Sequence, residues 1–446
     1  MIQQLLFIVL LLVVSYLAFK SYRHIYKSIK LGKDLKIEGD TSARWKNTFL
    51  VAFGQKKMFK RIIPAVLHLF IYVAFLFTQI ELIEIIVDGV FGQHRFFAGA
   101  LGGLYTLIIN SIEFLSFGAL IATIIFLWRR NLLKVPRLVM PEMNGWPKID
   151  ANNILFAEIV LVMAIFTMNG ADTLLQDIDP AHYPDTGHLV ISSIVGNTFF
   201  SGLSAGTLHV LERAGWWLHI LVVFGFLLYL PISKHLHILL AFPNVYFSRL
   251  KSRGEMNNMP EIMTEVKSML GLGDPNVEEP PMTDELPDFG VKDIFDLSWK
   301  NILDAYTCTE CGRCSSVCPA SQTGKKLSPR KVMMDIRDRT AEIAEQVKDK
   351  DYDRKDFDDG KSLHDLITEE ELFACTTCNA CVEACPVMIN PLEPILELRR
   401  YKILTESAGP GDWLPMFTSL ENTGAVWQMP SERIDWAKPL MEEGES

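Results

Sequence analysis

The sequence of 446 residues predicts an all-α protein in two parts, a bundle of five transmembrane helices followed by a charged helical domain. The apolar segments that are long enough to span a bilayer all lie before residue 248, and all eight cysteines lie between Cys308 and Cys385. A mean hydropathy of +0.19 with 22% charged residues is too apolar for a soluble enzyme and too charged for a chain wholly inside a membrane. The net charge of −10 argues against nucleic-acid binding, which requires a basic surface.

Five segments approach the roughly 20 residues that a helix needs to cross the hydrocarbon core. We expect them at about 2–19, 62–87, 104–128, 154–170 and 216–242. The first has no basic start and no small-residue cleavage site, so we interpret it as a spanning helix and not as a signal peptide. Residues 188–211 are apolar but rich in Gly, Ser and Thr, and we expect surface or re-entrant helices there instead of a sixth span.

Lys and Arg are concentrated in two of the four loops of the bundle, 20–61 and 129–148. Cytoplasmic loops carry such an excess. This distribution predicts a multi-pass protein of a bacterial-type cytoplasmic (inner) membrane, with its N-terminus outside and everything after the fifth helix in the cytoplasm. A sixth span would reverse the side of the cysteine domain.

The chain after the bundle divides by composition into three segments. Residues 248–290 are acidic and contain several prolines, which predicts a linker. Residues 291–404 predict a compact domain of short helices. Residues 405–446 carry three tryptophans among Gly and Pro, and we expect an extended tail that wraps a partner or the domain itself.

The cysteines form two copies of the pattern C-x2-C-x2-C-x3-C-P, the spacing that holds a [4Fe–4S] cluster. In such paired motifs the fourth cysteine ligates the cluster of the other motif. The predicted ligand sets are therefore Cys308, Cys311, Cys314 and Cys385 for one cluster, and Cys375, Cys378, Cys381 and Cys318 for the other. Structural zinc also uses C-x2-C, but zinc gives no reason for a fourth cysteine followed by proline in both copies.

Three histidines of the bundle are candidates for haem ligation. His68 and His237 lie a few residues inside the predicted cytoplasmic ends of the second and fifth helices, where two facing imidazoles could hold one haem b. His219 precedes His237 by five helical turns, so an unbroken helix would present both on one face, about 27 Å apart. The alternative is that these are hydrogen-bonded packing residues, although ionisable side chains inside membranes are usually functional.

Four carboxyl groups also lie within predicted spans: Glu81, Glu84, Glu113 and Glu158. They could relay protons in quinone chemistry, or they could be ordinary groups near the ends of helices. No glycine-rich nucleotide loop and no Walker motif occurs in the sequence.

The stretches Trp216–His219 and Leu230–His237 resemble the last helix of the respiratory nitrate reductase gamma family. They resemble still more the membrane domains of heterodisulfide-reductase-type iron–sulfur oxidoreductases, including electron-transfer-flavoprotein:menaquinone oxidoreductases. The resemblance implies one haem b between His68 and His237, and a second at His219 whose partner position is occupied by Thr78. The long insert between the cysteine motifs resembles the α-helical ferredoxin modules of succinate dehydrogenase and heterodisulfide reductase.

The resemblance implies an electron-transfer subunit that connects a cytoplasmic redox partner, two [4Fe–4S] clusters, haem b and the membrane quinone pool. Larger relatives carry Cys-Cys-rich repeats after the ferredoxin module, whereas no cysteine follows Cys385. We therefore expect the catalytic part on a separate chain, either a Cys-Cys-rich iron–sulfur subunit or an electron-transfer flavoprotein. The alternatives are a redox-sensing membrane protein without quinone turnover and a redox-driven transporter, which would show broken helices or inverted repeats.

Overall fold

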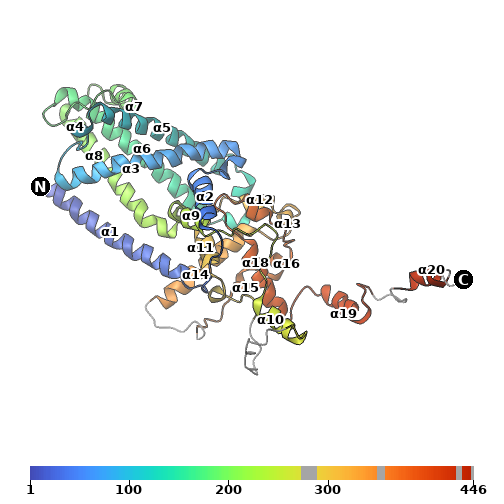
Figure 1. Ribbon diagram of the computed structural model, residues 1–446. Coiled ribbons are helices and arrows are strands. Elements are labelled where there is room, and N and C mark those ends of the chain that lie inside the picture. Colours follow the sequence, from blue (N-terminus) through green and yellow to red (C-terminus); the bar gives the residue numbers. More distant parts are fainter. Residues whose placement is uncertain (273–288, 349–356, 428–433, 443–446) are drawn as a thin grey trace.

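The computed structural model describes residues 1–272, 289–348, 357–427 and 434–442. These residues form helices and loops and contain no strand, only one β-bridge between Lys33 and Ser298. The predicted all-α class is confirmed. Figure 1 shows a bundle of long helices, with the short helices of the C-terminal domain gathered at one of its ends.

Five helices are long and apolar enough to cross a membrane. They are α1 (Ile2–Ile29), α3 (Ile62–Phe91), α5 (Gly103–Asn131), α6 (Trp146–Ile178) and α8 (Ala205–Tyr229). Their outer surfaces expose large apolar side chains such as Leu5, Leu12 and Phe114, which water would disfavour and lipid would accept. The chain is a membrane protein with the five predicted spans.

Close packing between α6 and α8 depends on a glycine. A Cβ atom at Gly215 of α8 would lie 2.7 Å from the backbone nitrogen of Met168 and 2.8 Å from the carbonyl oxygen of Ala164. On the neighbouring face of the bundle, the ring of Phe7 from α1 lies between Trp216 and Phe224, with ring centroids 5.4 and 6.2 Å away. Both contacts hold α8 at the centre of the bundle.

The segment 188–211 is not a sixth span, as the sequence predicts. It contains a short helix, α7 (Val190–Val195), which continues as one π-helical turn over Gly196–Phe200. Its last part, from Ala205, is already the start of α8. The surface interpretation therefore applies to its first half only.

The fifth helix ends earlier than predicted, and the expectation that His219 and His237 share one unbroken helix is wrong. After α8 ends at Tyr229, two 3-10 turns follow, and His237 is the first residue of a separate helix, α9 (His237–Tyr246). Pro231 has no N–H to continue the helix, and Ser233 is extended with φ −114° and ψ 150°. The inference that the two imidazoles lie five turns apart on one face fails for this reason.

The C-terminal domain packs on the end of the bundle where α1 finishes. Its helices are α11 (Trp299–Thr307), α12 (Arg313–Val317), α13 (Pro319–Gln322), α14 (Pro329–Val347), α15 (Leu363–Leu366), α16 (Glu369–Phe373), α17 (Ala380–Ala384) and α18 (Leu392–Arg400). Ile29 and Leu236 from the bundle belong to the same apolar core as Ile302 and Ile336 from the domain. The two parts are therefore joined by a shared core.

The connecting segments contain more helix than the sequence predicts. The expected linker includes α10 (Pro260–Met269), while residues 273–288 lie outside the described residues. The expected extended tail contains α19 (Trp413–Thr423) and α20 (Lys438–Glu442), and it leads away from the domain in Figure 1. Trp413 packs its ring 5.1 Å from that of Phe373, so the start of the tail contacts the domain.

Candidate functional site

Four thiols from both cysteine motifs line one cavity of about 350 Å³. Cys308 follows α11, Cys311 lies in the next loop and Cys314 lies on α12, while Cys385 comes from the end of α17. Gly312 turns the loop with a φ of +68°, and a Cβ there would lie 2.8 Å from the carbonyl oxygen of Arg137. The fold thus brings Cys385 to the first motif, as the crossed ligand pattern requires.

The remaining four cysteines lie near one another on the side of the domain away from that cavity. Cys318 precedes α13 and is within electrostatic range of Cys375 and Cys381. Cys378 is exposed to solvent. Among the described residues, no three His, Cys, Asp or Glu side chains converge as ligands of a single metal ion would.

Burial governs the protonation of these thiols when no metal is bound. Burial, together with neighbouring thiols, raises the pKa of Cys308 and Cys385 to about 12. Backbone amides oppose this: Ile389 N donates to Cys385 Sγ at 3.3 Å, and Thr377 N donates to Cys375 Sγ at 3.4 Å. Metal binding at such sites must release protons, because thiolates are the ligands.

A buried ion-pair network connects the first cysteine loop to the membrane bundle. Glu310, between Cys308 and Cys311, is 2% exposed and pairs with Lys234 from the break after α8. Arg337 Nη1 donates to the other oxygen of Glu310 at 2.7 Å. Burial alone would raise the pKa of Glu310, but Lys234 and Arg337 hold it below its usual value, so the carboxylate is ionised.

The break after α8 is itself held by a carboxylate of α6. Asp150 accepts hydrogen bonds from Tyr229 Oη at 2.8 Å, Ser233 Oγ at 2.7 Å and Lys234 N at 3.1 Å. Asp150 is 1% exposed. These bonds replace the helical ones that Pro231 removes, so the break has a defined geometry.

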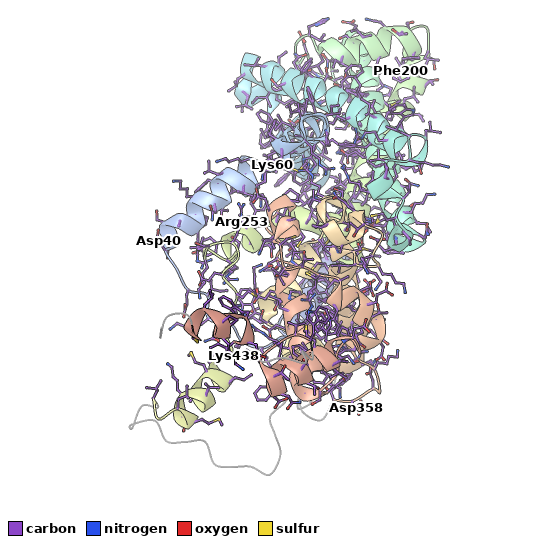
Figure 2. The ribbon with its side chains drawn as sticks, turned by 90° about the vertical axis from the view of Figure 1, so that its right-hand side faces the viewer. Asp40, Lys60, Phe200, Arg253, Asp358 and Lys438 are labelled. Atoms are coloured by element: carbon purple, nitrogen blue, oxygen red, sulfur yellow. The ribbon has the colours of Figure 1, made fainter. Side chains whose placement is uncertain are left out.

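Basic residues form a second connection between the loop before α3 and the cysteine domain. Arg61 donates to Ser316 Oγ at 2.8 Å, and Arg313 donates to Lys57 O at 3.2 Å. Lys60 and Arg253, both labelled in Figure 2, pair with Glu383 on α17. The basic loop of the sequence therefore lies against the C-terminal domain.

Three imidazoles meet at this same end of the bundle. His68 and His237 lie within electrostatic range of each other, and His235 lies beside them with its ring centroid 5.6 Å from that of His237. His68 Nδ1 lies 3.2 Å from Gln55 Oε1, and His237 Nδ1 lies 3.0 Å from Lys234 O. Because both Nδ1 atoms are engaged by acceptors, each Nε2 is free to bind a metal, as in histidine ligation generally.

His219 is separate from this group. It is 5% exposed, and its Nδ1 lies 3.5 Å from Leu161 O. Thr78, at the position where the resemblance would place a partner, donates its hydroxyl to Phe75 O at 3.1 Å. The structure thus brings His68 and His237 together and gives His219 no counterpart at Thr78.

Sequence reasoning missed His235, Gln55 and the ion pair of Lys234 with Glu310. His235 is only two residues from His237, and its Nδ1 is buried without a hydrogen-bond partner among the described residues. Gln55 is 6% exposed with a φ of +49°, which is unusual for a residue other than glycine. A lysine at the end of a membrane helix and a glutamate between two cysteines were the available signals.

These features define a class: a membrane-anchored iron–sulfur protein of the electron-transfer or oxidoreductase type. Residues 304–389 match the model of the 4Fe-4S dicluster domain. The chain is 28% identical over 436 residues to the probable iron-sulfur-binding oxidoreductase FadF of Bacillus subtilis, covering 92% of this chain and 57% of that protein. It is 24% identical over 447 residues to the EtfAB:quinone oxidoreductase of Syntrophomonas wolfei, covering 95% and 58%.

The C-terminal domain has a further relative. It is 29% identical over 102 residues to one of the subunits of the ferredoxin:CoB-CoM heterodisulfide reductase of Methanosarcina mazei, covering 23% of this chain and 48% of that one. The homologues are therefore the iron–sulfur oxidoreductases that the sequence resembles. The chain spans somewhat more than half the length of the two relatives that it matches along most of its own length. No solved structure matches it significantly.

Proposed function

We propose that this chain transfers electrons between a cytoplasmic redox partner and the membrane quinone pool. The path uses two [4Fe–4S] clusters and one haem b, each of which accepts and returns one electron at a time. The observation that carries the proposal is the position of the cavity of Cys308, Cys311, Cys314 and Cys385. It lies at the junction with the bundle, on the same side as His68 and His237.

The ligand sets of the two clusters follow from the placement of the thiols. We assign Cys308, Cys311, Cys314 and Cys385 to the cluster next to the membrane, and Cys375, Cys378, Cys381 and Cys318 to the outer cluster. Since Cys378 is exposed, the outer set is the one that a soluble partner can approach. Arg313, within electrostatic range of Cys311, Cys385 and His68, lies between the inner set and the imidazoles.

The haem ligands in this proposal are His68 and His237. Gln55 and the carbonyl of Lys234 fix their ring orientations, and the buried pair of Lys234 with Glu310 fixes the break from which His237 projects. His219 is assigned to a second haem only if another group supplies the ligand that Thr78 lacks.

The proposed orientation has the dicluster domain in the cytoplasm. The basic loops 20–61 and 129–148 lie on the domain side: Arg61 bonds Ser316, and Arg330 of the domain donates to Arg137 O at 2.6 Å. Positive residues favour the cytoplasmic side. In this orientation the N-terminus is outside.

The proposed electron donor or acceptor is a separate protein, either an electron-transfer flavoprotein or a Cys-Cys-rich iron–sulfur subunit. One relative is named for an EtfAB and quinone reaction, and another is itself part of a heterodisulfide reductase. We propose menaquinone as the membrane substrate, as in a respiratory chain.

Cluster ligation is tested by Cys318→Ser in anaerobically purified protein. The wild type should contain about eight irons and eight sulfides in its two cubanes. The variant should alter the electron paramagnetic resonance signal of the outer cluster and preserve that of the inner one. Loss of the inner signal alone would contradict the crossed ligands.

Haem ligation is tested by His68→Ala and His237→Ala, with exposed His182→Ala as the control. Dithionite-reduced wild type should show a b-type α-band, and each of the first two variants should lose the same spectral component. A quinol analogue should reduce that component in membranes. Protein with full clusters and no haem band would exclude the haem, and the imidazoles would then be packing residues.

A further inference from the structure

A buried polar cluster lies at the end of the bundle opposite the dicluster domain. Glu81 follows Arg61, the junction residue, by 20 positions, which is about 30 Å along an α-helix. Figure 2 shows the two ends, with Phe200 at the far one and Asp358 in the domain. The far-end cluster consists of Glu81, Glu84, Asp88, His94, Arg95, Tyr105, Asn169 and Asp172.

The cluster contains more acidic than basic groups. Its four carboxyl groups are 8% exposed or less, and they face one guanidinium, Arg95, and one imidazole, His94. Even with His94 protonated, ionisation of all four carboxyls would leave two negative charges uncompensated. Buried unpaired charges are strongly disfavoured, so at least one of these carboxyl groups holds a proton.

Three of the four carboxylates are well supplied with hydrogen-bond donors. Asp88 accepts from the backbone nitrogens of Arg95 and Phe96 at 2.9 and 3.1 Å. Glu84 accepts from Tyr105 Oη at 2.7 Å and from a further backbone nitrogen at 2.9 Å. These donors stabilise the ionised form.

Asp172 is the third well-supplied carboxylate. It accepts from Arg95 Nη2 at 3.2 Å and from Gln176 Nε2 at 3.0 Å, and it lies 2.7 Å from His94 Nε2. It is fully buried, whereas the His94 side chain is 19% exposed. Asp172 therefore connects the interior of the cluster with the surface at the far end.

Glu81 is the exception. Its Oε1 has only a long contact of 3.5 Å from Asn169 and a distance of 3.9 Å to Arg95 Nη1. Its Oε2 is buried with no hydrogen-bond partner in the described part of the chain, and the residue is 1% exposed. The charged groups that act on it are Arg95, Glu84 and Glu113, of which two are acidic. Glu81 is the carboxyl least able to carry a charge.

We propose that Glu81 is a proton-binding site that is neutral in the resting protein and exchanges its proton with the far face through Asp172 and His94. Glu81 and Asp172 flank the same guanidinium of Arg95, and Asp172 bonds the partly exposed imidazole. Such a site lets the bundle take up or release a proton when its charge changes. The inference does not depend on haem or quinone.

Infrared spectroscopy of the full-length protein in nanodiscs tests the protonation. Neutral carboxylic acids give a carbonyl stretch that carboxylates lack, and Glu81→Gln should remove one such band. Glu158→Gln, which changes a span carboxyl outside the far-end cluster, is the control and should leave that band in place. Glu81→Asp keeps a carboxyl and should shift the band without removing it. Folded Glu81→Gln protein that retains every carbonyl band would overturn the proposal.

Thermal stability gives an independent readout. Gln is a neutral isostere, so Glu81→Gln should leave the thermal midpoint unchanged if Glu81 is neutral. Asp172→Asn removes an ionised partner of Arg95 and should lower the midpoint. Equal losses in the two variants would mean that Glu81 is ionised.

Hydrogen–deuterium exchange tests the route. The Glu81 band should shift after transfer to D2O, and His94→Gln, which keeps a hydrogen-bonding side chain without a titratable ring, should slow that shift. An unchanged rate would exclude exchange through His94.

Discussion

The junction between the cysteine loop and the membrane bundle depends on Lys234, and Lys234→Met tests this directly. The lysine is 8% exposed, pairs with Glu310, and donates to Pro147 O at 2.6 Å. Methionine has a similar length and an apolar side chain, so it fills the space of the lysine stem but removes its charge. The substitution leaves one oxygen of Glu310 buried beside an uncharged side chain.

The expected cost follows from the groups that remain. Removing one partner of a buried ion pair costs about 3–5 kcal/mol. Glu310 retains Arg337 at 2.7 Å, and Asp150 retains Ser233 Oγ at 2.7 Å, so we expect the lower limit of about 3 kcal/mol. At about 2–4 °C per kcal/mol for a unit of this size, the thermal midpoint should fall by roughly 6–12 °C.

The assay is the loss of cluster absorbance on heating in detergent under anaerobic conditions. Lys251→Met is the matched control, because Lys251 pairs with Glu255 at 3.4 Å but is 52% exposed. Exposed pairs contribute about 0–1 kcal/mol, so this variant should behave like the wild type. In the double variant Lys234→Met/Glu310→Gln, the cost should be about 1–3 kcal/mol less than the sum of the single costs.

Two results would refute the reasoning. If Lys251→Met lowers the midpoint as much as Lys234→Met, burial does not distinguish the pairs. If the costs of the two junction substitutions simply add, Lys234 and Glu310 do not interact, and the domain is held by its apolar core alone.

Two further predictions concern Gln55 and the acid stability of the domain. Gln55→Leu removes the acceptor at His68 Nδ1 and should weaken haem binding about 10–100-fold, measured by haem titration, whereas Gln79→Leu on α3 should not. Hydrogen bonds from Arg339 at 2.7 and 2.8 Å hold the pKa of Asp359 well below its usual value. Because the unfolded chain then binds a proton that the folded chain does not, stability should fall as pH drops below about 4. Circular dichroism melts of Asp359→Asn should show a smaller acid loss than the wild type, and an identical loss would contradict this.

The sequence alone determined the two-part organisation. Hydropathy over some 20 residues is a property of the chain itself, so the five spans were predictable, as was the absence of a sixth. The cysteine pattern is equally local, and it predicted the dicluster domain that the family model matches. Helix ends were less predictable: Pro231 lies within an apolar run, and only its neighbours decide whether a helix continues past it.

The histidines show the limit of local reasoning. Depth matching predicted that His68 and His237 would approach each other, and the structure places them within electrostatic range. It could not predict that His237 begins a new helix or that His235 joins the group, because both depend on Asp150 of α6 binding the residues after Tyr229.

Only the tertiary structure decided which polar residues matter. Glu81, Glu84, Glu113 and Glu158 look alike in the sequence, each a carboxyl within an apolar segment. The fold gives Glu84 a tyrosine and a backbone amide, and it leaves one oxygen of Glu81 without a donor. The state of a buried carboxyl depends on donors that come from other helices, and the distances to those donors are set by packing across the bundle and not by the order of residues along one chain segment.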